Sequence, residues 1–147
     1  MYGTQKYYLI GSNNPLLRQE AEEVTDFSGI EGLVNDMKVL LSEQKKAAVG
    51  LAAPQIGVSK RVFIAKMGRE IKEFVNPKII NSKWYSLSWE ECLSMLELTN
   101  LKVRRYSITV EYQNMYGEQR TEKYRGLNSR IVQHEIDHLN GILIIRD

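Results

Sequence analysis

The chain has 147 residues, of which 43% are hydrophobic and 26% charged, and its formal net charge is +2. This composition excludes a disordered chain, and no apolar run approaches the length of a membrane span. We therefore expect a single domain over residues 1–147 with no membrane partner. A net charge this small also gives no reason to expect a direct nucleic acid partner.

A reducing compartment is expected. The chain has one cysteine, Cys92, so it forms no internal disulfide. The opening residues MYGTQKYYLIGSNNP lack the apolar core and the cleavage pattern of a secretory signal. These two observations predict a cytoplasmic protein.

Two helices are expected in the first third of the chain. Asn14-Pro15 predicts a turn into a short helix that runs to about Val24. From Ser28 onward, apolar residues follow the spacing of an amphipathic helix that covers the core, with Ser28 and Glu31 as a capping box. The apolar positions of this helix are Ile30, Leu33, Val34, Met37, Leu40 and Leu41.

The middle of the chain is predicted to be extended. Ile108, Val110 and Tyr112 alternate with polar residues, which is typical of a strand with one face in water. Tyr116-Gly117 predicts the turn that leads from this strand to the next. The expected strands cover residues 61–66, 72–80, 84–92, 102–112 and 119–124.

The last predicted element is a helix over residues 127–139, which ends near Asn140-Gly141 because glycine favours a helix stop. Leu127, Ile131, His134 and His138 then share one face of the helix and point inward.

The only two histidines of the chain lie four residues apart around Glu135, as His134 and His138 in QHEIDHLNG. On a helix, this HExxH spacing lets both imidazoles bind one metal ion, with the glutamate beside them as a base. A lone buried histidine is more often a core residue whose hydrogen bonds are satisfied. Two of them with a glutamate favour a metal, because burial without one leaves several polar nitrogens in need of partners.

A catalytic metal usually has three protein ligands and one open position. After His138 only Asp147 could supply a carboxylate, so the third ligand is expected upstream. Cys92 in WEECLSM is the natural candidate, since a thiolate is a good ligand for soft metals. Elimination therefore predicts a Cys92, His134 and His138 set.

A third segment, GLAAPQIG at residues 50–57, is rich in small residues. A turn packed against the core explains it about equally well. The alternative is a close approach of two backbones, with Gln55 as an amide that donates to a developing oxyanion.

The segments GLAAPQIG, ECLSM and QHEIDHLNG resemble, in order and spacing, the three signature motifs of the peptide deformylases, and NNPLLR extends the resemblance toward the N-terminus. The resemblance implies an α+β fold with antiparallel sheets packed around a central C-terminal helix that carries HExxH. It also implies that Cys92, His134 and His138 bind iron(II) in the cell, which zinc(II) or nickel(II) replaces during purification. The implied reaction removes the formyl group from formyl-methionyl nascent peptides close to the ribosome, by an enzyme expected to be monomeric.

The chemistry expected of such a site can be argued from general principles. A bound metal lowers the pKa of a water molecule to about 7, and Glu135 can take the released proton and pass it to the departing amine. The Gln55 amide and, from the resemblance, the Leu93 backbone N–H are expected to stabilise the oxyanion.

The substrate is expected to lie as an added strand between Val49-Gly50 and Glu91, with Ile131 lining the pocket for the methionine side chain. The resemblance also pairs Glu90 with Arg104, although a simple surface carboxylate is as good an interpretation of Glu90. Two residues depart from the family pattern, Glu91 where glycine is usual and Leu96 where proline is usual, and the chain stops soon after the HExxH helix. These departures bear on peptide preference.

Two alternatives stay open at this stage. An HExxH metallopeptidase would need a carboxylate as third ligand, and the missing downstream ligand argues against it. A metal-stabilised protein that only captures peptide ends would need neither Gln55 nor Glu135.

Overall fold

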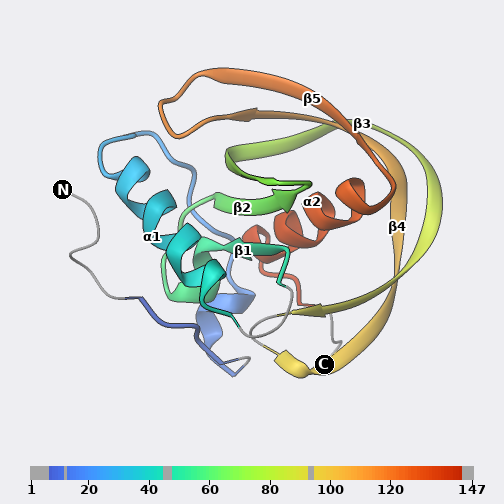
Figure 1. The fold of residues 1–147 in the computed structure, drawn as a ribbon, viewed down its shortest axis with the longest axis horizontal. Helices are drawn as coiled ribbons and strands as arrows, with labels where there is room; N and C mark the ends of the chain where they lie inside the picture. The colour runs from blue at the N-terminus through green and yellow to red at the C-terminus, as the bar shows by residue number, and fades with distance from the viewer. Residues whose placement is uncertain (1–6, 12, 45–47, 93–94, 144–147) are drawn as a thin grey trace.

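The computed structural model describes residues 7–11, 13–44, 48–92 and 95–143, and between residues 89 and 100 it describes the backbone alone. The described residues form two α-helices and five strands (Figure 1). The helices are α1 (Ile30–Ser42) and α2 (Gly126–Leu139), and two 3₁₀ turns, η1 (Pro15–Arg18) and η2 (Ala53–Ile56), precede and follow strand β1. The strands are β1 (Gly50–Ala52), β2 (Val62–Met67), β3 (Glu70–Cys92), β4 (Met95–Gln113) and β5 (Gln119–Arg125).

The strands form one antiparallel sheet in the order β1-β2-β3-β4-β5. The long strands β3 and β4 bend around α2, which lies inside the curve (Figure 1). The predicted α+β class is confirmed, as is the central position of the C-terminal helix. The two strands expected at 72–80 and 84–92 are one strand, β3, whose register shifts near Val75 and Ile79 accommodate the bend.

Alternation along the sheet divides the core into two layers. In β2, Phe63 and Ala65 belong to the cluster that contains the apolar side chains of α2, whereas Val62 and Ile64 belong to the cluster that contains those of α1. Successive side chains of a strand point to opposite faces, so this short strand is buried on both sides. The helix α1 therefore covers the core, as predicted.

The start of α1 differs from the prediction. The residue that caps the helix is Gly29, with φ of 81°, and no side chain caps the first turn. The Ser28 backbone N–H donates instead to Asp26 Oδ1 at 2.9 Å. The predicted capping box of Ser28 and Glu31 is therefore wrong, because the cap position is Gly29, in the left-handed conformation, and not Ser28.

The predicted helix from Asn14 to Val24 is also wrong beyond its first turn. Pro15–Arg18 is a single 3₁₀ turn, capped by Asn14, whose side chain accepts from the Leu16 N–H at 3.0 Å. The chain then becomes extended, since the Ala21 N–H donates to Leu139 O at 2.7 Å and Glu22 bridges to Lys60. Long-range backbone pairing here overrides the weak local preference for helix.

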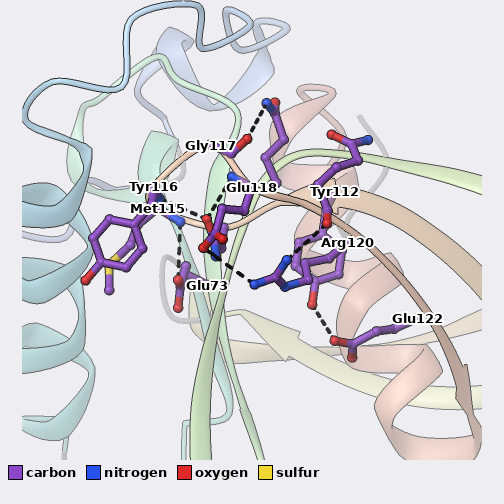
Figure 2. Close-up of polar contacts among 11 residues, drawn as sticks. Glu73, Tyr112, Met115, Tyr116, Gly117, Glu118, Arg120 and Glu122 are labelled. Atoms are coloured by element: carbon purple, nitrogen blue, oxygen red, sulfur yellow. Dashed lines mark hydrogen bonds and ion pairs between the residues drawn. The ribbon is translucent and has the colours of Figure 1, made fainter.

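The turn between β4 and β5 lies at Tyr116-Gly117, as predicted. Asn114 Oδ1 accepts from the backbone N–H groups of Tyr116 and Glu118, both at 3.0 Å, and Gly117 has φ of 83° (Figure 2). Within the part of the chain that the structure describes, no helix has both the length and the apolar character needed to cross a membrane.

Candidate metal centre

The helix α2 carries the residues of the HExxH motif on a buried face. It begins at Gly126 and ends at Asn140-Gly141, where Gly141 has φ of 74°. A Cβ at Gly141 would lie 2.6 Å from the Arg18 backbone, so only glycine fits there. Ile131 is 6% exposed and belongs to the core, but Leu127 is 65% exposed. The prediction that Leu127 points inward is wrong, because the first turn of α2 projects beyond the core.

His134 and His138 lie side by side in the protein interior. They are 9% and 1% exposed, and their ring centroids are 5.0 Å apart with an interplanar angle of 70°. The predicted inward orientation of both histidines is confirmed. One turn of helix brings the two imidazoles to the same side, as the i, i+4 spacing requires.

Glu135 is directed toward strand β1. It is 4% exposed, and its carboxylate lies so close to the Gly50 backbone that a Cβ at position 50 would meet Oε2 at 2.5 Å. The close approach of α2 to β1 therefore depends on the absence of a side chain at Gly50. This is the close contact that the small residues of GLAAPQIG allow.

Gln55, in η2, has a fixed amide. The side chain is 2% exposed, and its Oε1 accepts a hydrogen bond from the Ala52 backbone N–H at 2.9 Å. Because the carbonyl end is held by the backbone, the NH₂ end must point the other way, as a donor. Ala52 and Gln55 both belong to the segment that follows Gly50, so this orientation is set by the same motif.

Hydrogen bonds attach α2 to strand β4. Gln133, which precedes His134, accepts from the Arg105 N–H at 2.9 Å and donates to Arg105 O at 2.8 Å. Ser129 Oγ donates to the same carbonyl at 2.8 Å. These contacts fix the rotation of the helix and thereby the direction of the two imidazoles.

An ion pair involves a residue that lies between the two histidines on the helix. Arg104 Nη1 is 2.5 Å from Asp137 Oδ2, and the side chains are 6% and 23% exposed. Asp137 was not predicted as the partner of Arg104. An acidic residue on the histidine helix and an arginine in a strand of alternating polarity are the only features of the sequence that point to this pair. The side chain of Glu90, the expected partner of Arg104, lies outside the described residues.

The structure brings four of the predicted site residues together in two contacts, His134 with His138 and Glu135 with Gly50. Val49 precedes β1 and is 43% exposed, and its carbonyl accepts from the Lys66 N–H at 2.7 Å. The backbone of Glu91 and Cys92 ends strand β3, but their side chains lie outside the described residues, as does all of Leu93.

The histidine pair fits a divalent metal. A ligating imidazole nitrogen lies about 2.0–2.1 Å from zinc and the ring centre about 1 Å beyond, so two ligands at a tetrahedral angle have centroids about 5 Å apart. The observed separation is 5.0 Å. Among the described side chains, no group of three histidine, cysteine, aspartate or glutamate residues could hold a metal.

A buried HExxH helix inside a curved antiparallel sheet is typical of a metal-dependent hydrolase. Comparison with known proteins narrows this class. The family model for polypeptide deformylases matches residues 7–147. The chain therefore belongs to the polypeptide deformylase family, whose members use a metal to remove the N-formyl group from nascent peptides, and this is its activity.

Individual relatives agree with this assignment. The peptide deformylase of Desulfitobacterium hafniense is 39% identical, over 95% of this chain and 92% of its own. The crystal structure of the enzyme from Thermotoga maritima is 35% identical, with a TM-score of 0.91 and 95% of each chain covered. That from Thermus thermophilus is 41% identical, with a TM-score of 0.89, over 94% of this chain and 83% of its own.

Proposed function

We propose that Cys92, His134 and His138 hold one divalent metal ion, iron(II) in the cell and zinc(II) or nickel(II) when these replace it. The observation that carries the proposal is the pair of buried imidazoles, 5.0 Å apart, on a helix whose intervening residue is a buried glutamate. The ECLSM motif supplies Cys92, and a thiolate with two imidazoles is a donor set that suits these metals.

When bound, the metal acts as a Lewis acid and lowers the pKa of a water molecule to about 7. Glu135 is the proton acceptor in this proposal. Its carboxylate is confined between α2 and the backbone of Gly50, so it has little freedom to rotate. It takes the proton from the attacking water and later delivers it to the departing amine.

The Gln55 amide and the Leu93 backbone N–H are proposed as donors to the developing oxyanion. The Ala52 N–H holds the carbonyl end of Gln55, so the NH₂ end needs no reorientation before the reaction. Preorganised donors of this kind typically lower the barrier by about 3 kcal/mol each.

The substrate is proposed to bind as an added strand. Strand β1 is at the edge of the sheet in the described residues, so one side of its backbone has no neighbouring strand there and could pair with a peptide. Glu91 would pair from the other side, and Ile131 would contact the methionine side chain. A formyl group carries only hydrogen on its carbonyl carbon, so a narrow site beside Glu135 would accept it and exclude acetyl.

The substrates of the family are formylated nascent peptides, and we propose that this chain meets them as a monomer in the cytoplasm, close to the ribosome. Release of formate from formyl-Met-Ala-Ser by iron-loaded protein purified without oxygen tests the activity. We expect Glu135→Ala to lose at least about a hundredfold while it keeps its metal, and retained activity would contradict the role of Glu135.

A further inference from the structure

The convex face of the sheet, which points away from α2, carries two polar rows across three strands. Asn81, Thr109 and Lys123 are paired neighbours in β3, β4 and β5, and Lys83, Ser107 and Arg125 form the next row. Partners in an antiparallel sheet point to the same face. The alternate residues Ile108 and Tyr124 lie in the core cluster with α2, so the side chains of both rows point to the opposite face of the sheet.

The two rows form a cationic site. Lys83, Lys123 and Arg125 are exposed, and no ion pair within the described residues involves any of them. A shallow hollow beside the two lysines is lined by Asn81, Ser82, Lys83, Ser107, Ile108, Thr109 and Lys123. The hollow therefore offers two ammonium groups, the Thr109 hydroxyl and the Asn81 amide, which together suit a phosphate oxygen, whereas Ser107 is only 4% exposed. The next outward residue of β4 beyond Thr109 is a carboxylate, Glu111.

An aromatic platform continues this face in the other direction. Tyr85 pairs with Arg105, whose guanidinium lies 3.9 Å from the centre of the tyrosine ring. Tyr85 is 66% exposed, and the next outward pair, Leu87 and Val103, is 62% exposed at each residue. Large apolar groups this exposed beside exposed cations are typical of an interaction surface.

We propose that this convex face, comprising Lys83, Tyr85, Arg105, Lys123 and Arg125 around the hollow at Ser107, binds single-stranded RNA. The three exposed cations contact backbone phosphates, and a base stacks on Tyr85 or its arginine partner. An acidic polypeptide would use the cations but has no need of the tyrosine. The net charge of +2 conceals this face because acidic residues elsewhere balance it.

The proposed RNA site is independent of the metal site. The metal helix lies on the concave side of the sheet and the two rows on the convex side, so RNA and a peptide could be bound together. Formate release and RNA binding can therefore be measured separately on the same preparation, and failure of one does not imply failure of the other.

The test is fluorescence anisotropy of the full chain with a labelled oligouridylate of about twelve nucleotides, in about 50 and 200 mM KCl. Three phosphate contacts predict that log K falls with log salt with a slope of about −2. We expect Lys83→Glu with Lys123→Glu to weaken binding at least about tenfold. The matched control, Lys66→Glu with Arg69→Glu on β2 and its turn, makes the same charge change on exposed residues elsewhere and should weaken binding less than about threefold.

Tyr85→Ala separates stacking from charge, since it should weaken binding about fivefold or more with the salt slope unchanged. All variants should release formate at the wild-type rate, which shows that they are folded. No binding of the oligouridylate, equal losses in the control variant, or equally tight binding of polyglutamate would overturn the proposal.

Discussion

The carboxylate of Glu135 lies directly against the α-carbon of Gly50, so that a methyl group there would come within 2.5 Å of Oε2. Strand β1 and helix α2 lie far apart in the sequence, but they come into close contact here because Gly50 has no side chain. The position of the proposed base therefore depends on this glycine. Gly50 thus affects both the position of the proton acceptor and the strand edge on which a peptide would pair.

Gly50→Ala should therefore impair catalysis more than folding. The added methyl displaces the Glu135 carboxylate, and a displacement of about 1 Å can cost about a hundredfold in rate. We expect kcat for formate release to fall at least about tenfold with metal content unchanged. Gly11→Ala is the matched control, because a Cβ at Gly11 meets nothing within 4 Å. Equal activity of the two variants would contradict the proposed role of the contact.

The buried ion pair between Arg104 and Asp137 should stabilise the fold and the helix that carries the histidines. Asp137→Asn removes a charged hydrogen bond to a mostly buried guanidinium, so it should lower the free energy of unfolding by about 2 kcal/mol in urea titrations. The control is Arg120→Met, since the pair of Arg120 with Glu118 is 46% and 58% exposed and should be worth less than about 1 kcal/mol. Similar losses of stability in both variants would contradict the claim that the pair of Arg104 and Asp137 contributes more than an exposed pair.

Much of the fold follows from local patterns in the sequence. The amphipathic spacing of α1, the alternation of β4 and the glycine stop of α2 all depend on periodicity or on a single residue type, and these predictions are confirmed. The predicted helix after Asn14 failed because residues 21 and 22 pair with backbone far away in sequence. No local signal reveals such a partner.

The predictions for the site divide in the same way, into relations within one helix and contacts between distant segments. HExxH spacing was enough to place His134 and His138 together, because a helix fixes their relation. The contact of Glu135 with Gly50 and the pairing of Arg104 with Asp137 join segments whose approach is determined by the sheet. The Gly50 contact could be anticipated only as the presence of small residues in GLAAPQIG.

A carboxylate that accepts three hydrogen bonds should make stability depend on pH. Burial raises the pKa of Glu122, but hydrogen bonds from Lys72, Tyr112 and Tyr124 outweigh it and hold the pKa below the ordinary value of 4.5. The contact of Tyr112 with Glu122 is drawn in Figure 2. A group whose pKa is lower in the folded state contributes stability above its unfolded pKa and loses it as the pH falls.

Glu122→Gln should accordingly destabilise the protein more at about pH 7 than at about pH 3, because the stability contributed by the ionised carboxylate is lost as the pH falls below its ordinary pKa. The free energy of unfolding measured at both pH values checks this expectation. Glu70→Gln, at an exposed position in the same sheet, is the control and should show no such difference between the two pH values. An equal loss at both pH values for Glu122→Gln would contradict the assignment.

The ligand set is the central claim, and X-ray absorption spectroscopy of zinc-loaded protein tests it most directly. One sulfur at about 2.3 Å and two imidazole nitrogens at about 2.0–2.1 Å are expected, with the sulfur lost in Cys92→Ala. A shell of nitrogen and oxygen alone in the wild-type protein would contradict the claim that Cys92, His134 and His138 share one metal ion.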